Sequence, residues 1–180
     1  MTPLRSIFGC TRIFLFVIRK QICLPVILLV KLAFTQVANG QVQRLPEFHF
    51  LRLSDGKPFT QRDLQPPKKT LFVFFDTECP HCMQAVSTWN DNHSAMDGLH
   101  TVLLTMDPPE AAIPFLRRFA DKIISKKQVV TARDPERQFI SRFLPKKYPS
   151  MFLFSEKGIL LRYTDDEKDI PSLIRLIPKK

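Results

Sequence analysis

The chain has 180 residues, with 27 lysines and arginines against 17 aspartates and glutamates, and a net charge of +10. This length allows one domain with a hydrophobic core of its own. The basic residues stand in short pairs on different predicted elements, such as Lys68-Lys69 and Lys146-Lys147, whereas a nucleic-acid-binding protein concentrates them in one patch. The composition therefore argues against nucleic acid as a partner.

The first 40 residues have the pattern of an export signal. A basic start is followed by an apolar run from Ile22 to Phe34, and no acidic residue occurs in this part. A membrane-spanning helix needs about 20 apolar residues, and this run is shorter. Ala38-Asn39-Gly40 places small residues at the −3 and −1 positions of a cut before Gln41. We expect residues 1–40 to be a cleaved export signal or an uncleaved N-terminal anchor, and residues 41–180 to form one domain.

The leader also changes the cysteine count. Cys10 and Cys23 lie within it, so the exported domain keeps only Cys79 and Cys82. A small exported domain held together by disulfides has more cysteines, spread more widely. We expect an exported, periplasmic protein, either free or tethered to the inner membrane by its leader. In such a protein, one close cysteine pair indicates a reactive site and not a structural disulfide.

The domain begins with a predicted hairpin and continues with alternating elements. Residues 47–53 alternate apolar and polar side chains, which is typical of a half-buried strand, and 54–58 have turn chemistry. Residues 70–75 are apolar throughout, as in an interior strand covered on both faces. Further strands are expected at 100–105, 128–131, 150–154 and 159–163, and helices at 80–96, 107–124, 134–143 and 169–177. This order predicts an α/β domain with a mixed sheet and helices on both faces.

The two cysteines stand at the start of the predicted helix 80–96, where Pro80 suits the first helical position. Unpaired N–H groups and the positive end of the dipole at a helix N-terminus favour a thiolate. We therefore expect Cys79 to be the exposed attacking thiol. Cys82, one turn further on, is the expected resolving thiol that displaces a mixed disulfide.

Two neighbouring side chains act in opposite directions. A protonated His81 favours the thiolate and makes the disulfide a better oxidant, whereas the carboxylate of Glu78, if close, disfavours it. The sequence leaves open which prevails, and we expect a moderately or strongly oxidising couple. A zinc half-site and an inert disulfide are the alternatives. Zinc needs two more ligands, which His81 and His93 do not supply well, so we expect no metal, and no organic cofactor because the electrons reside in the sulfur pair.

Four landmarks in order resemble the thioredoxin-like family, and within it the exported TlpA/ResA-type thiol–disulfide oxidoreductases near the alkyl hydroperoxide reductase/thiol-specific antioxidant group. They are the hairpin at 45–58, the strand and cysteine motif at 72–82, the helix at 107–122 and the proline loop and hairpin at 148–158. The resemblance covers 45–177. It implies a thioredoxin-like fold with an N-terminal β-hairpin and an inserted helix.

Pro149 alone is a proline at the start of a strand, because only about 5–6% of X–Pro bonds are cis. The resemblance implies instead a cis-proline that faces the dithiol. It also implies that the backbone of Tyr148 pairs with an extended substrate chain. Together these features predict a thiol–disulfide oxidoreductase. Its expected site residues are Cys79, Pro80, His81, Cys82 and Glu78, with Tyr148 and Pro149 in the substrate groove.

We expect a monomer whose partners are thiol- or disulfide-containing exported proteins and a membrane-bound electron donor or acceptor. Two alternatives remain, a non-catalytic metal carrier or assembly factor on the same fold, and a thiol peroxidase. Phe75 and Asp76 break the Pro-x-x-x-Thr/Ser-x-x-Cys pattern of a peroxidatic cysteine, which argues against the peroxidase.

The motif also departs from these relatives. Glu78 replaces the tryptophan that commonly precedes the first cysteine, and Val73 stands where thioredoxin has a buried acid. Ala85 and Val86 occupy the region in which some relatives carry another acid. Proton transfer to Cys82 is therefore expected to rely on water or on Glu78.

Overall fold

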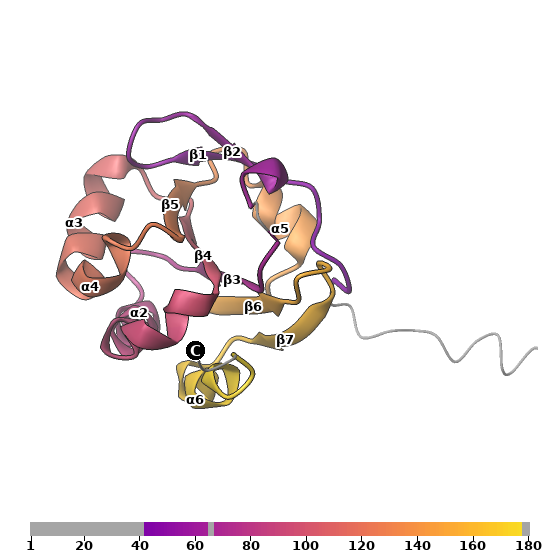
Figure 1. The fold of residues 1–180 in the computed structure, drawn as a ribbon. Coiled ribbons are helices and arrows are strands. Elements are labelled where there is room, and N and C mark those ends of the chain that lie inside the picture. Colours follow the sequence, from indigo (N-terminus) through magenta and orange to yellow (C-terminus); the bar gives the residue numbers. More distant parts are fainter. Residues whose placement is uncertain (1–41, 65–66, 178–180) are drawn as a thin grey trace, which may run out of the picture. The chain divides into compact units, whose positions relative to one another are not determined.

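The computed structural model describes residues 42–64 and 67–177, which form a mixed sheet with helices on both faces (Figure 1). The strands of this part lie in the order β2-β1-β5-β4-β3-β6-β7. The export-signal prediction and the boundary at 40/41 lie outside the described residues. The strand bounds are β1 (His49–Arg52), β2 (Pro58–Thr60), β3 (Thr70–Phe74), β4 (His100–Thr105), β5 (Val129–Arg133), β6 (Ser150–Phe154) and β7 (Leu160–Thr164).

The central strand β3 is parallel to β4 and antiparallel to β6, and β4 is parallel to β5. The predicted N-terminal hairpin is confirmed as β1–β2, and the C-terminal one as β6–β7. The helices are α2 (Pro80–Asp91), α3 (Pro109–Phe119), α4 (Asp121–Ile124), α5 (Gln138–Phe143) and α6 (Ile170–Ile174). Short 3-10 turns are η1 (Gln61–Asp63), η2 (His93–Gly98) and η3 (Glu167–Asp169).

All four predicted helices begin or end elsewhere, and the one expected at 169–177 is the shorter α6, Ile170–Ile174. The helix expected at 80–96 ends at Asp91, because Asn92 leaves the helical conformation with φ −99° and ψ 30°, and its side-chain amide caps the helix by donating to the Thr88 carbonyl. The chain then tightens into η2. The helix expected at 134–143 begins only at Gln138, because Arg137 adopts a left-handed conformation with φ 57°.

The helix expected at 107–124 is divided at Ala120, whose φ of −133° is not helical. The side chain of Asn90, on α2, bonds the far side of this break. It accepts the Lys122 N–H at 2.9 Å and donates to Asp121 at 2.7 Å. A contact between two helices therefore satisfies the groups that the break exposes.

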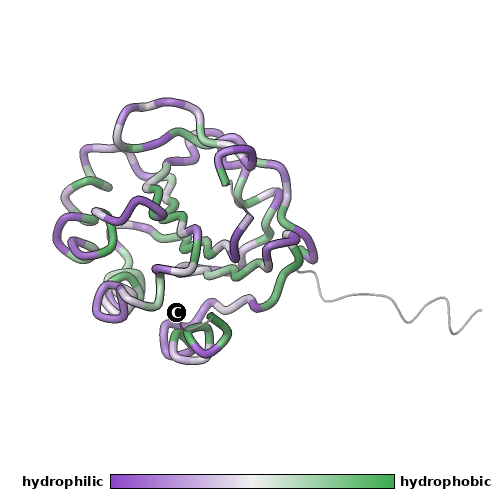
Figure 2. Tube along the Cα trace, viewed as in Figure 1, coloured by the Kyte–Doolittle hydropathy of each residue, from purple (hydrophilic) through white to green (hydrophobic). Residues whose placement is uncertain are grey.

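The side chains of β3 alternate between two separate cores. Leu71 and Val73 point to the helical face, which we define as the face covered by α2, α3, α4 and α6. Phe72 and Phe74 point to the phenylalanine face, which α5 covers and to which the β1–β2 hairpin adds its own phenylalanines. Figure 2 shows hydrophobic residues concentrated along the central strands. The central strand β3 is therefore buried on both faces, as the apolar run 70–75 predicted.

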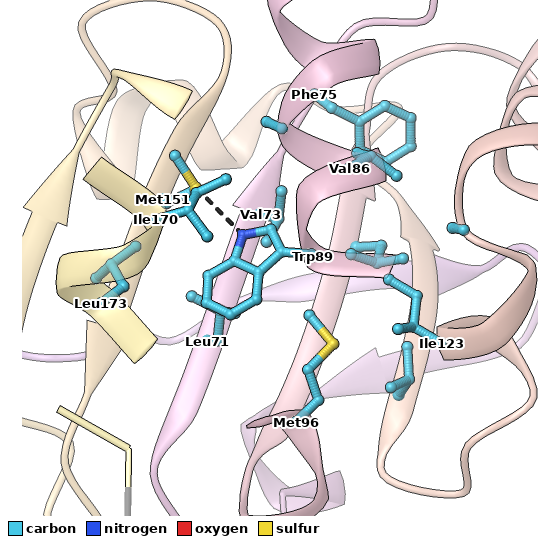
Figure 3. Packing of buried hydrophobic residues seen from close by; sticks show 14 of the residues in the cluster. Leu71, Val73, Phe75, Val86, Trp89, Met96, Ile123, Met151, Ile170 and Leu173 are labelled. Carbon is cyan, nitrogen blue, oxygen red and sulfur yellow. Dashed lines mark hydrogen bonds between the residues drawn. The ribbon is translucent and has the colours of Figure 1, made fainter. Parts of the chain in front are cut away.

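On the helical face, Trp89 of α2 is fully buried and its indole N–H donates to the sulfur of Met151, 3.4 Å away, on β6 (Figure 3). Figure 3 also shows Leu71, Met96, Ile123 and Leu173 around the same cluster. This packing fixes α2, the helix that begins at the cysteine pair, against the sheet. In residues 42–64 and 67–177, no helix is long and apolar enough to cross a membrane.

Candidate functional site

The cysteine pair lies where β3 passes into α2. Cys79 is the N-cap residue of α2 and Pro80 is its first residue, as predicted. The Cys79 carbonyl accepts the N–H groups of Cys82, at 3.0 Å, and Met83, at 3.1 Å. Both cysteines are free thiols, and Cys79 is half-buried whereas Cys82 is fully buried. The structure therefore presents one sulfur to a partner and keeps the other behind it.

The loop before Cys79 is held by two aspartates. The carboxylate of Asp107, after β4, accepts the Thr77 N–H at 2.8 Å and the Thr105 hydroxyl at 3.1 Å. Asp76 accepts the Glu78 N–H at 2.8 Å. These bonds satisfy backbone donors that would otherwise need water, so they fix the path by which the chain enters α2.

Burial raises the pKa of the Cys82 thiol far above its ordinary value, and the nearby Cys79 and Asp76 raise it further. The backbone N–H of Asp76 donates to the Cys82 sulfur at 3.5 Å and opposes this shift. The reduced Cys82 therefore holds its proton at neutral pH. The expected division of labour between an exposed attacking thiol and a buried resolving thiol agrees with this burial.

Asp76 is a carboxylate near the dithiol that the sequence analysis did not assign to the site. Its charge acts on the Cys82 thiol and on the Tyr148 phenol, whereas Glu78 is exposed and lies at the surface of the loop. Asp76 is thus a carboxylate beside the resolving thiol, and the expected proton transfer through water or Glu78 stays a prediction.

His81 lies on the exposed side of the first turn of α2, with 67% of its side chain exposed. Its Nδ1 lies 3.0 Å from a carboxylate oxygen of Glu167, in η3. Glu167 itself is only 9% exposed. Its pKa is lowered, chiefly by a backbone hydrogen bond and then by His81. The imidazole predicted to act on the thiolate therefore has a carboxylate partner.

Tyr148 and Pro149 lie at the same edge of the sheet as the dithiol. Phe74 pairs with Ser150, so the end of β3 that leads to the cysteines meets the start of β6. The Tyr148–Pro149 bond is cis, as the resemblance implied. The Tyr148 ring packs on Phe74 with centroids 4.8 Å apart, and burial, with the charges of Asp76 and Asp107, raises the pKa of its phenol to about 12.

The fold therefore brings together the predicted cysteines, His81 and the Tyr148-Pro149 pair. Sequence reasoning missed Asp76, Asp107 and Glu167. The first was noted only as a departure from a peroxidase pattern, and the second only as the start of a helix. Nothing local marked Glu167. Among residues 42–64 and 67–177, no three His, Cys, Asp or Glu side chains converge on a common metal position.

No protein-family model matches the chain, and no curated protein matches it. Solved structures do. The thioredoxin domain of a thiol-disulfide oxidoreductase from Bacteroides vulgatus aligns with a TM-score of 0.62 at 14% identity, covering 78% of this chain and 100% of that one. A secreted Mycobacterium tuberculosis disulfide oxidoreductase, homologous to E. coli DsbE, gives 0.59 at 16% identity, covering 72% and 95%.

Peroxidoxin BcpB from Mycobacterium tuberculosis aligns with a TM-score of 0.61 at 14% identity, covering 77% of this chain and 97% of that one. Likeness at such identities concerns the fold. The chain has the thioredoxin-like fold that its sequence predicted, with a mixed sheet between helices, an N-terminal hairpin and helix α3 inserted after β4.

Proposed function

We propose that this thioredoxin-like chain is a thiol–disulfide oxidoreductase that acts on cysteines of exported proteins. One observation carries the proposal, namely that a half-buried Cys79 at the N-cap of α2 stands one turn before a fully buried Cys82. This is the arrangement that disulfide exchange requires, because one sulfur must be reachable and the other must be shielded until it resolves the mixed disulfide.

The exchange conserves electrons within the sulfurs. In the oxidising direction, a client thiolate attacks the Cys79 sulfur of the Cys79–Cys82 disulfide and releases Cys82 as a thiolate, which is then protonated. A second client thiolate attacks the client sulfur of the mixed disulfide and releases Cys79. The reducing direction reverses each step. Asp76, whose charge reaches Cys82, exchanges the proton of the resolving thiol with solvent.

The surroundings suit a protein client. Tyr148 precedes Pro149 beside the dithiol, and we assign its backbone to pair with an extended client segment. The basic and apolar pattern of residues 1–40 supports export to the periplasm, and one similar structure is that of a secreted protein. A membrane-bound thiol or disulfide partner would then restore the dithiol after each turnover.

The test is an insulin-reduction assay and a dithiol-oxidation assay on the full chain, with Cys79→Ser and Cys82→Ser. We expect both variants to lose turnover, and Cys82→Ser to accumulate a mixed disulfide at Cys79, because the resolving thiol is gone. Cys10→Ser, in the leader, is the matched control and should keep full activity. Unchanged turnover in both site variants would exclude the proposal.

Two further measurements separate the rival functions. Native mass spectrometry of the protein would show a stoichiometric metal ion for a metal carrier, and a gain of two hydrogen atoms on reduction for a redox dithiol. Likeness to a peroxidoxin makes peroxide the other substrate to assay. Fast peroxide consumption that depends on Cys79, without insulin reduction, would favour the peroxidase over the oxidoreductase.

A further inference from the structure

We infer that Glu167 is a positioning residue that limits the oxidising power which His81 gives to the Cys79/Cys82 couple. The inference rests on the proposed function, since it concerns the redox couple of that same site. It identifies a group outside the cysteine motif that sets the equilibrium position of the exchange.

The geometry of the pair comes first. Glu167 is carried by η3, directly before α6, and its carboxylate oxygen lies 3.0 Å from Nδ1 of His81 on α2. The pair is unequal, because the histidine side chain is 67% exposed whereas Glu167 is 9% exposed. The exposed imidazole ring of His81 is thus hydrogen-bonded to a carboxylate whose own position is fixed by its burial.

The direction of the hydrogen bond follows from the charge. The pKa of Glu167 is lowered, so its carboxylate is ionised at neutral pH and can only accept. Nδ1 of His81 must therefore carry the proton of this bond. The neutral ring is fixed as the Nδ1–H tautomer, and Nε2 becomes the nitrogen that gains or loses the second proton.

The charge balance then differs from that of a lone histidine. With the ring protonated, His81 and Glu167 together have a net charge of zero, where a lone imidazolium carries +1. With the ring neutral, the pair carries −1. A positive neighbour favours the Cys79 thiolate and with it the reduced form, so it makes the disulfide more oxidising. Glu167 therefore cancels this advantage when the ring is protonated, and it adds a negative charge that disfavours the thiolate when the ring is neutral.

Other charged or titratable groups belong to the elements on either side of the ring. On the dithiol side they are Cys79 itself and Glu78. The segment that packs against α2 contributes Asp166, which caps η3 by accepting the Lys168 N–H, and Asp169, which accepts the Thr164 hydroxyl. Asp166 and Asp169 thus have partners of their own, and within the part of the chain that the structure describes Glu167 is the carboxylate that bonds His81.

The experiment measures the equilibrium constant for reduction of the protein disulfide by two molecules of glutathione. The products are the protein dithiol and glutathione disulfide. All proteins are the full chain with Cys10→Ser and Cys23→Ser, so that only the site cysteines react. Acid-quenched, alkylated samples give the reduced fraction by mass spectrometry. The variants are Glu167→Gln, His81→Gln and the double variant, with Glu156→Gln on the exposed β6–β7 turn as the control for charge.

The measurement is made at pH 5.5, which lies below the ordinary histidine pKa of about 6.5 and at which the lowered pKa of Glu167 keeps it ionised. There, Glu167→Gln should raise the equilibrium constant toward the reduced protein by about threefold to tenfold, tenfold being about 30 mV. His81→Gln should lower it by a similar factor, because Glu167 then acts alone. The double variant should return close to the wild-type value, and Glu156→Gln should change nothing. These opposite signs are what charge compensation predicts and a structural defect does not.

Imidazole ¹⁵N spectra at pH 8 supply the second readout. The His81 ring should be the Nδ1–H tautomer in the wild-type protein and should lose this preference in Glu167→Gln. An unchanged or lowered equilibrium constant in Glu167→Gln would overturn the inference, and so would an unchanged tautomer. The glutathione equilibrium needs no client protein. If the protein turned over neither insulin nor a dithiol substrate, the proposed function would be wrong, but the effect of Glu167 on the equilibrium could still be measured.

Discussion

The two faces of the central sheet are packed with different kinds of side chain. On the phenylalanine face, rings from α5, from the hairpin and from β3 and β6 pack on one another, and Phe139 and Phe143 stack at 4.1 Å. The helical face mixes aliphatic side chains with directed polar contacts, such as those of Trp89 and Asn90. Only the helical face carries the dithiol helix. We conclude that the phenylalanine face mainly contributes stability, whereas the helical face holds the dithiol helix α2 in a fixed position on the sheet.

The largest effect is expected on the phenylalanine face. Phe139→Ala removes a fully buried ring that packs on Phe74 and Phe143. It should lower the free energy of unfolding by about 3–5 kcal/mol, measured by urea denaturation. The exposed neighbour Ile140 on the same helix is the control, because Ile140→Ala should cost about 0.5 kcal/mol or less. If the glutathione equilibrium of folded Phe139→Ala also shifted, the separation of the two faces would be wrong.

A smaller loss of stability, with a larger effect on function, is expected at the loop before the dithiol. Asp107→Ala leaves the Thr77 N–H without its acceptor and should cost about 1–3 kcal/mol. Because this loop places Cys79, the rate of insulin reduction should fall more than the stability alone explains. Glu110→Ala, an exposed acid in the first turn of α3, is the control. Full activity in Asp107→Ala would show that the loop needs no support from β4.

The smallest effect is a pH dependence. Glu167 has a lowered pKa in the folded protein, so its contribution to stability is complete above its unfolded pKa, near 4.5, and is lost as the pH falls through the folded value. Urea midpoints of wild-type protein and Glu167→Gln should therefore differ at pH 6 and converge as the pH falls below 4.5. Midpoints that stay parallel over this range would mean that the carboxylate contributes through its shape and not its charge.

The sequence predicted the parts of this molecule that depend on neighbours along the chain. The apolar run that forms β3, the proline that opens α2 and the turn residues of the two hairpins each act locally. The break at Ala120 was missed because its partner, Asn90, belongs to another helix. For the same reason the site was predicted with its cysteines and without Asp107.

The redox direction shows the same limit. From the motif alone, His81 favours a more oxidising couple and Glu78 opposes it, so the sequence left open which of the two prevails. The fold brings Glu167 to it from 86 residues away, and no spacing rule connects two groups so distant in sequence. A motif therefore predicts which atoms react, while the charge that tunes them depends on the folded surroundings.

The buried indole described above has a practical consequence. Trp89 is the single tryptophan of the chain, it lies on the helix that begins at the dithiol, and its N–H contacts a sulfur. Tryptophan emission from this protein therefore comes from one fully buried position. Its wavelength reports whether α2 still packs on the sheet, so an optical signal built into the fold can follow unfolding of the dithiol helix without a label.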